Sequence, residues 1–148
     1  MFPYGKTAAN AVAAMSYLAQ SHGDPPRKVN SAEISRERGI SKALVAKILT
    51  ILSQAGLVAG SPGPGGGYYL ARDPEKICLF DIIEHFERTD QPVSCPFGPE
   101  WCGNKAPCPL HDKILELNRQ AEEFLRSNRL SAFSPRAHLE AEMEKTDA

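Results

Sequence analysis

The sequence predicts a mainly α-helical fold with a small β-hairpin, and three observations lead to this prediction. Apolar residues recur at helical spacing through much of the N-terminal half. A Gly/Pro-rich turn near the middle separates two short runs typical of β-strands. A Cys- and Pro-rich segment then precedes a further long helical pattern. With 148 residues, of which 42% are hydrophobic, the chain can form one ordinary domain or a small domain with an extension.

The N-terminal half is predicted to contain three helices, the first over residues 6–20. Asn30 or Ser31 can cap a short second helix, and Ser41 can cap a third. Gly39 supplies the turn between these two, because glycine adopts positive φ at little cost. Two helices joined by such a turn are typical of a helix-turn-helix, although an ordinary helical hairpin has the same pattern.

The third predicted helix has two different faces. Its apolar face, from Leu44 to Leu52, is expected to be buried. The opposite face is small, polar and basic, which suits entry into the major groove of DNA. The candidate DNA-contacting residues at the start and on the outer face of this helix are Ser41, Lys42, Ala43, Ala46, Lys47 and Thr50.

A β-hairpin is predicted directly after this helix, which ends at Gly56. Its glycine-rich turn lacks the Lys-Ser/Thr pair of a phosphate-binding P-loop. A hairpin in this place is instead typical of the wing of a winged helix, which lies along DNA. We therefore predict a winged helix-turn-helix DNA-binding head over residues 1–77, with Gly65, Gly66 and Tyr68 of the wing at the DNA.

The charges are distributed unevenly, although the formal net charge is only −1. The first 76 residues carry nine Lys/Arg and five Asp/Glu, whereas the remaining residues carry eight and thirteen. Such asymmetry indicates a nucleic-acid-binding half joined to a half with another role. Chance variation of surface charge is the alternative.

The segment from Cys95 to His111 is expected to bind a metal. Cys95, Cys102, Cys108 and His111 follow C-x6-C-x5-C-x2-H spacing, and prolines and glycines keep the segment out of regular structure. Three thiolates and an imidazole suit zinc, and they also suit an iron–sulfur cluster. Disulfide pairing or simple burial of the cysteines are the other readings. Cys78 stands apart and is expected to be buried or close to a helix cap, as is His85, in a helix over residues 79–87.

The segment 78–134 is expected to combine the cysteine loop with a dimerisation helix over residues 110–127. Its apolar residues step by four and three, as in a coiled-coil seam. The partner that suits such a seam is a second copy of the chain, giving a homodimer with two DNA-binding heads for a palindromic operator, although packing onto its own head is the alternative. The Glu-rich residues 135–148 are expected to be disordered. The residues that form the seam are Leu110, Ile114, Leu117, Ala121 and Phe124.

The sequence shows neither a secretory signal nor an apolar stretch of membrane-spanning length. We therefore expect a cytoplasmic protein without a membrane partner, in a compartment where thiols stay reduced. We also expect that the protein is not an enzyme, because it lacks a CxxC pair, a nucleophile–base pair and a substrate-cradling motif.

Several motifs together resemble a known family. They are Met-Ser-Tyr-Leu-Ala from Met15, Gly-Ile-Ser from Gly39, Gly-Leu-Val from Gly56, Gly-Pro-Gly-Gly-Gly-Tyr from Gly63, Asp-Ile-Ile-Glu from Asp81, and the three-cysteine loop before a long helix. From Lys6 to about Phe133 the chain resembles the bacterial winged-helix iron–sulfur transcriptional regulators of the IscR/NsrR/RirA type.

The resemblance implies a DNA-binding transcriptional regulator that senses iron–sulfur, iron, redox or nitric oxide status. By this resemblance Cys95, Cys102 and Cys108 would hold an iron–sulfur cluster, with [2Fe-2S] favoured over [4Fe-4S]. The alternative is a structural-zinc Cys3His module that binds RNA or protein. Iron with acid-labile sulfide, against zinc, distinguishes the two.

This chain departs from the family pattern in the wing and in the expected ligand set. Family members often carry an arginine before the Gly-Pro-Gly-Gly-Gly-Tyr motif, where this chain has Pro62. Some members supply a fourth ligand as a carboxylate on the first helix, but Ala8-Ala9-Asn10 offers none. His111 is therefore the best local candidate for the fourth ligand.

Overall fold

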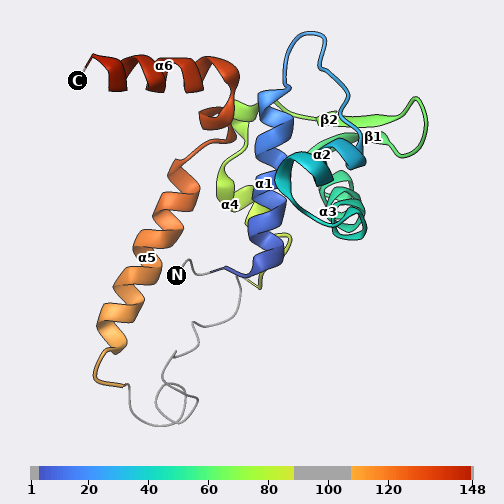
Figure 1. The fold of residues 1–148 in the computed structure, drawn as a ribbon. Coiled ribbons are helices and arrows are strands. Elements are labelled where there is room, and N and C mark those ends of the chain that lie inside the picture. Colours follow the sequence, from blue (N-terminus) through green and yellow to red (C-terminus); the bar gives the residue numbers. More distant parts are fainter. Residues whose placement is uncertain (1–3, 89–107, 148) are drawn as a thin grey trace.

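The computed structural model describes residues 4–88 and 108–147, and every structural statement below concerns those residues. Helices dominate the fold, and one two-stranded antiparallel sheet accompanies them, which confirms the predicted fold class. The elements, shown in Figure 1, are α1 (Lys6–Gln20), α2 (Ser31–Arg38), α3 (Lys42–Gln54), β1 (Val58–Ser61), β2 (Gly67–Leu70), the 3-10 turn η1 (Pro74–Lys76), α4 (Leu79–Ile83), α5 (His111–Ser127), the 3-10 turn η2 (Leu130–Phe133) and α6 (Pro135–Thr146).

Local hydrogen bonds explain where α2 and α3 begin. The Asn30 side chain accepts a hydrogen bond of 2.7 Å from the backbone N–H of Glu33, and Ser41 accepts one of 3.3 Å from Leu44. These caps satisfy donors that the first helical turn leaves unpaired. Gly39, at φ 63°, ends α2 in the left-handed conformation. The caps and the turn between the two helices are therefore as the sequence predicted.

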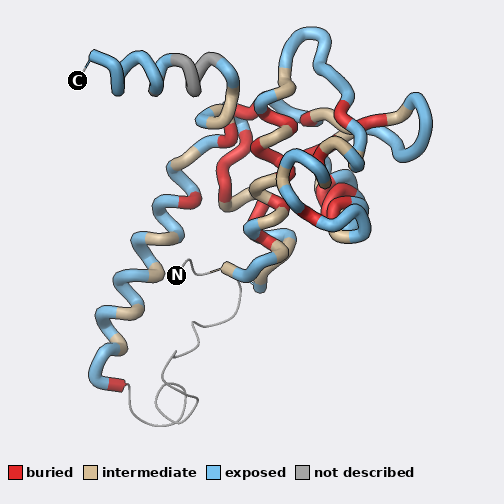
Figure 2. The backbone as a smooth tube through the Cα atoms, in the orientation of Figure 1, coloured by how far each residue is buried: buried red, intermediate tan, exposed pale blue. Residues whose placement is uncertain are grey.

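The main hydrophobic core lies where α1 crosses the helix-turn-helix, as the buried segments of Figure 2 show. The buried face of α3 packs there together with Met15 and Leu18 of α1. Leu130 of η2 also reaches this core and is fully buried, so the chain after α5 returns to the head. Full burial of a side chain such as Leu130 stabilises the fold by about 1.5–3 kcal/mol.

A second, smaller apolar cluster attaches α5 to the head. Leu125 near the end of α5 packs with Ala8, Leu79 and Ile83. Two backbone hydrogen bonds flank this contact, from Leu79 to the Asn128 carbonyl (3.0 Å) and from Leu130 to the Ile77 carbonyl (2.8 Å). Away from this end, α5 extends from the head as a separate rod (Figure 1).

Three features differ from the predictions. Helix α4 ends at Ile83 instead of continuing to residue 87, because the chain turns there and the Glu87 carboxylate accepts a hydrogen bond of 2.5 Å from Gly5, at the start of α1. His85 is exposed on this turn and is neither buried nor at a cap. The segment expected to be disordered contains α6, which starts at Pro135, where proline suits the first helical position, and is rich in helix-forming Glu and Ala.

Candidate DNA interface and cysteine loop

Helix α3 presents its predicted contact face to solvent. Val45, Ile48, Leu49 and Leu52 are buried on the opposite side and hold the helix against α1 and α2. The Thr50 hydroxyl donates to the Ala46 carbonyl at 2.9 Å, so its oxygen remains able to accept a hydrogen bond. The residues exposed on the free face are Ser41, Lys42, Ala43, Ala46, Lys47 and Thr50.

The lysines and arginines of the helix-turn-helix region fall into two groups. Arg27, Arg36 and Arg38 are held by protein partners: Arg27 and Arg36 by Glu33 and Glu37, and Arg38 by acceptors on α1. Lys28, Lys42 and Lys47 form no ion pair with any residue that the structure describes. Together with Arg36, whose side chain is 72% exposed in its contact with the adjacent Glu37, these lysines are the cations available to an external polyanion.

A polar network fixes α2 against α1. Glu33 on α2 accepts hydrogen bonds from the Tyr17 hydroxyl (2.6 Å) and from Arg27 (2.8 Å). Arg27, and to a lesser extent Tyr17, lower the pKa of the Glu33 carboxyl, and the Glu33 carboxylate raises the pKa of the Tyr17 hydroxyl. Arg38 lies over the Tyr17 ring, 5.0 Å from its centre, and closes the same junction.

Near its turn, the backbone of the β-hairpin is so closely packed that only glycine fits at Gly60 and Gly66. In its register Ser61 pairs with Gly67, and Gly60 pairs with Tyr68. A Cβ atom at Gly60 would overlap the carbonyl oxygen of Gly67, and a Cβ atom at Gly66 would overlap that of Ser61. The turn therefore leaves the two strands close together and projects from the head beside α3 (Figure 1). Of the three wing residues predicted at the DNA, Gly65 is exposed, whereas Gly66 and Tyr68 are half-buried.

A third segment pairs with the hairpin, and the sequence analysis missed it. Val29 and Tyr68 exchange two backbone hydrogen bonds, of 2.9 Å from Val29 N–H and 2.7 Å from Tyr68 N–H. Val29 is fully buried between the exposed residues Lys28 and Asn30. A single valine between polar neighbours is too short a signal for a strand. The Tyr17–Glu33–Arg27 network was missed for a related reason, since its members lie on three separate segments.

Of the cysteine loop, only the end from Cys108 onward lies within the described residues. Cys108 is 5% exposed, and its carbonyl accepts a hydrogen bond of 3.0 Å from the N–H of His111, the first residue of α5. Cys95 and Cys102 lie outside the described residues. Among those that the structure describes, no group of three potential metal ligands occurs. The predicted set of four ligands is therefore represented by the adjacent pair Cys108 and His111.

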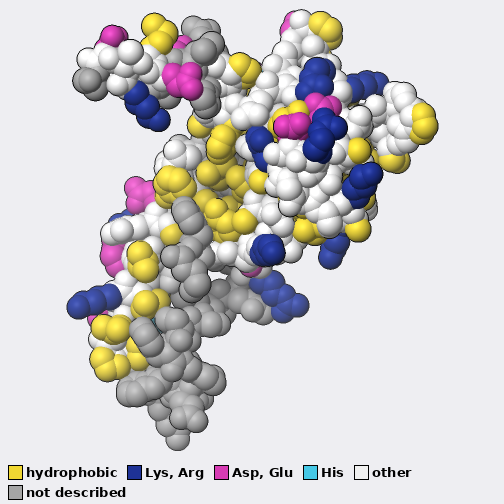
Figure 3. Space-filling view, in the orientation of Figure 1, with side chains coloured by type: hydrophobic (Ala, Val, Ile, Leu, Met, Phe, Trp, Pro, Cys, Tyr) yellow, Lys and Arg dark blue, Asp and Glu magenta, His cyan; other side chains and the backbone are white. Residues whose placement is uncertain are grey.

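Helix α5 carries exposed apolar side chains along its predicted seam. Leu110, Leu117 and Phe124 are 41%, 62% and 45% exposed, and Ile114 and Ala121 are partly exposed. Hydrophobic side chains line α5 and the angle between α5 and the head in Figure 3. Among the described residues of α5, Leu125 near its C-terminal end is the buried one, and it packs against the head.

The opposite face of α5 is occupied by ion pairs. Arg119 binds Glu116 at 2.7 Å and Glu123 at 2.9 Å, and Arg126 binds Glu122 at 3.0 Å. Arg119 lowers the pKa of Glu116 to about 2, so this face stays charged over the whole neutral range. Apart from Leu115, which is 44% exposed on the charged side, the large apolar residues of α5 thus follow one face, which is typical of a helix that packs against a partner along one side.

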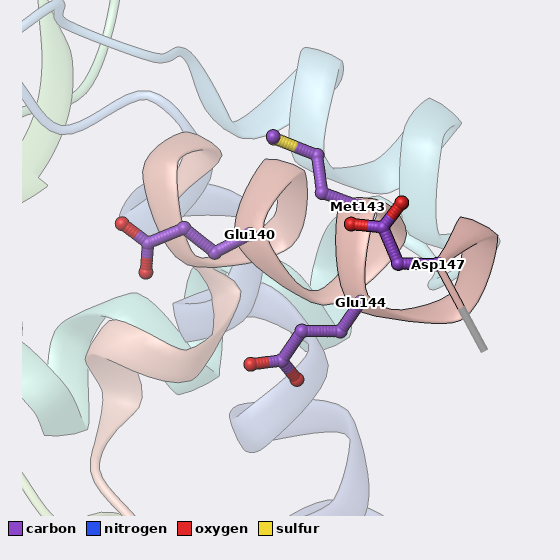
Figure 4. Close-up of a pocket in the computed structure, with 4 residues that line it drawn as sticks. All are labelled: Glu140, Met143, Glu144 and Asp147. Atoms are coloured by element: carbon purple, nitrogen blue, oxygen red, sulfur yellow. The ribbon is translucent and has the colours of Figure 1, made fainter.

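A shallow pocket lies along α6 (Figure 4) and is lined by Glu140, Met143 and Glu144 of that helix and by its C-cap residue Asp147. Three of the four are carboxylates, which repel phosphate groups. This pocket is therefore not part of a DNA-binding surface. Of the helices in the described ranges, none is both long enough and apolar enough to cross a membrane.

A helix-turn-helix with an exposed basic recognition helix and an adjoining β-hairpin defines a winged-helix DNA-binding protein. A family model described as an iron-dependent transcriptional regulator, Rrf2, matches residues 4–134. The chain therefore belongs to the Rrf2 family of transcriptional regulators, and it is not an enzyme.

Individual relatives agree with this assignment. The regulator IscR of Sodalis glossinidius is 35% identical over 115 residues, which cover 78% of this chain and 68% of that protein. The solved structure of T. potens IscR matches with a TM-score of 0.65 at 26% identity, over 88% of this chain and 84% of that one. The structure of CymR, the global cysteine regulator of B. subtilis, matches with a TM-score of 0.71 over 88% and 94% of the two chains, and its 24% identity shows a shared fold.

Proposed function

We propose that this regulator binds DNA as a homodimer and that an iron–sulfur cluster, held by Cys95, Cys102, Cys108 and His111, controls its DNA affinity. The observation that carries the proposal is the placement of Cys108 and His111. Cys108 is buried immediately before α5, and His111 begins that helix, joined to Cys108 by a backbone hydrogen bond. A thiolate and an imidazole at this spacing are a donor pair that iron–sulfur clusters and zinc both accept.

The cluster would supply a redox- and iron-sensitive link between three cysteines and the start of α5. The chain itself supplies the connection from there to the DNA. Leu125 at the other end of α5 packs on α1 and α4, and α1 packs on the helix-turn-helix. A change at Cys108 and His111 therefore acts on the one helix that joins the loop to the head. A histidine ligand must be neutral to bind, which makes occupancy of the site sensitive to pH.

The exposed seam of α5 is the surface that we assign to dimerisation. A second copy can cover it, because the seam is apolar and the opposite face is already occupied by internal ion pairs. Two copies related by a two-fold axis place two recognition helices for the two halves of a palindromic operator. Such a regulator acts where the chromosome lies, which places it in the cytoplasm.

A structural zinc site is the second candidate, and the chemistry of the donor set favours it equally. Cysteine thiolates and histidine are ordinary zinc ligands. In that case the metal would stabilise the loop without making DNA affinity depend on iron, redox state or nitric oxide. The two candidates make opposite predictions for metal content.

The test is the metal content of protein that has been purified without oxygen, with Cys78 as an internal control. We expect iron and acid-labile sulfide in the wild type and in Cys78→Ala, and neither in Cys108→Ala. Cys78 suits this control because it is also buried, and burial raises the pKa of its thiol, which disfavours the thiolate that a metal requires. Stoichiometric zinc in place of iron would establish the second candidate. Normal iron in Cys108→Ala would contradict the ligand assignment.

A further inference from the structure

The wing of this protein has no charge of its own. Between Lys47 and Arg72 the sequence contains no Lys, Arg, Asp or Glu. In Figure 3 the projecting turn of the hairpin shows hydrophobic side chains and no dark blue ones, whereas Lys and Arg side chains gather on the head beside it. A hairpin that lies along DNA without a cation gains nothing from phosphate neutralisation, which dominates affinity in such complexes.

The segment before α2 brings a cation to the base of this hairpin. Val29 pairs with Tyr68 through two backbone hydrogen bonds, so residues 28–30 lie alongside β2. The preceding residue, Lys28, is exposed. The pairing places Lys28 next to Gly67, the first residue of β2 after the turn.

The absence of a side chain at Gly67 makes room for Lys28. A Cβ atom built on Gly67 would lie 2.9 Å from the Cβ atom of Lys28 and 3.3 Å from its carbonyl carbon. Gly67 also has φ of 148°, a conformation that side chains with a Cβ rarely adopt. The close approach is therefore possible only because position 67 has no side chain, and the stem of Lys28 occupies the space beside the hairpin.

The charge of Lys28 is available, unlike that of its neighbour. Arg27 is bound to Glu33 and to Ser21. Lys28 forms no ion pair with any residue in the described ranges. A flexible four-carbon stem then lets its ammonium group extend along the uncharged hairpin.

We propose that Lys28 is the DNA-phosphate contact of the wing, supplied from the segment before α2 in place of a cation in the hairpin itself. This inference rests on the proposed DNA-binding mode, in which α3 and the hairpin face the same duplex. It adds to the contact surface a residue that is distant in sequence from both the recognition helix and the turn.

The experiment measures the affinity of the full-length protein for a fluorescent 30-base-pair duplex pool of random sequence at several salt concentrations. The slope of log affinity against log salt is negative, and losing one phosphate contact makes it shallower by about 1. We expect Lys28→Ala to make that slope shallower by about 1 for each bound head, and so by about 2 for a homodimer with both heads on the duplex, and to weaken binding at low salt by about 3- to 10-fold per head. Lys28→Arg should retain wild-type binding.

Two further variants make the result specific to the wing. Lys76→Ala removes another exposed lysine, from η1 beyond the far end of β2, and should leave affinity and slope unchanged. Ser61→Lys places a cation on the strand residue that pairs with Gly67, and in the Lys28→Ala background it should restore the slope.

Three outcomes would overturn the inference while leaving the DNA-binding function intact: Lys28→Ala behaves like Lys76→Ala, it weakens binding without changing the slope, or Ser61→Lys fails to restore the slope in a folded protein. Wild-type protein that binds no duplex at low salt would instead contradict the DNA-binding mode itself.

Discussion

The head and helix α5 differ in the burial of their apolar side chains, which are largely buried in the head and largely exposed along α5. In the head, the apolar faces of α1 and α3 meet, and residues such as Met15, Ile48 and Leu130 have no exposed surface. Along α5, Leu117 and Phe124 remain 62% and 45% exposed, and only Leu125 is buried. Within the described residues, the head therefore buries its apolar faces in one chain, whereas the seam of α5 keeps much of its apolar surface exposed.

This difference shows which properties one chain can determine alone. The stability of the head should depend on its own packing and should not change with protein concentration. The state of α5 should depend on concentration, because a surface that is covered by a second copy obeys mass action.

Charging the seam should separate the two copies. The double variant Ile114→Lys, Leu117→Lys would bury two unpaired ammonium groups from each copy in the dimer interface, at a cost of several kcal/mol per charge. We expect a monomer by sedimentation velocity at micromolar concentration and at least about 100-fold weaker binding to a palindromic duplex selected with the wild type, because two heads no longer bind together.

A matched control places two lysines on the opposite face of the same helix. Glu116 and Glu123 are exposed and bind only Arg119 in ion pairs, and such surface pairs contribute little. Glu116→Lys, Glu123→Lys should therefore remain dimeric. A monomeric wild type, or a dimeric seam variant, would show that α5 is not the interface.

Truncating the core of the head should lower its stability. Leu130→Ala should reduce the free energy of unfolding by about 2–5 kcal/mol, because it removes a fully buried side chain and leaves a cavity. Leu117→Ala on the exposed seam should change the unfolding of dilute protein by less than about 0.5 kcal/mol. Urea denaturation at two protein concentrations distinguishes them, and equal effects of the two variants would remove the contrast between head and helix.

A side chain at Gly60, where the hairpin backbone is closely packed, should destabilise the hairpin. Gly60→Ala requires a Cβ atom where the Gly67 carbonyl lies, at φ of 136°, and strain of this kind costs about 1–3 kcal/mol. Gly63→Ala is the control, since φ is also positive there but a Cβ atom meets nothing within 4 Å. We expect a lower Tm and weaker DNA binding for Gly60→Ala, and a smaller change in both for Gly63→Ala. Equal Tm and equal DNA affinity for Gly60→Ala and Gly63→Ala would show that close packing at Gly60 does not constrain the hairpin.

Much of the head could be predicted from sequence because its signals are local. Asn30 and Ser41 lie at helix starts where a side-chain acceptor is needed, and Gly39 lies where positive φ is needed. The pairing of Val29 with Tyr68 could not be predicted, since it joins single residues far apart in the chain. Disorder was expected for residues 135–148 because their composition is polar; the structure describes helix α6 there, and Glu and Ala are good helix formers.

The candidate DNA interface, like the head, could be predicted only where its sequence signals are local. The exposed face of α3 follows from its helical period, and all six predicted contact residues on it are exposed. The availability of individual charges does not follow from sequence, because it depends on which arginines find partners. Glu33 engages Arg27 across a turn, whereas the adjacent Lys28 forms no ion pair with a described residue.

The smallest expected effect concerns the pH dependence of the head. The pKa of Glu33 is lowered in the folded state, chiefly by Arg27, so its contribution to stability is present above the pKa of the unfolded chain, about 4.3. That contribution should be lost as the pH falls through the lower folded value. The difference in unfolding free energy between wild type and Glu33→Gln should therefore be constant from pH 7 to about 5 and shrink below about 4. A difference that grows on acidification would contradict the assigned sign.

The central claim is that the loop at the start of α5 controls the DNA affinity of the head, and the most direct measurement compares DNA binding by cluster-loaded and cluster-free protein. Fluorescence anisotropy with the selected palindromic duplex, at one salt concentration and without oxygen, gives both dissociation constants. We expect them to differ by at least about 10-fold, a coupling free energy of about 1.4 kcal/mol, and we expect Cys108→Ala to bind like the cluster-free wild type while Cys78→Ala follows the loaded protein. Equal dissociation constants for loaded and cluster-free protein, with the cluster verified by its iron and sulfide content, would contradict the account.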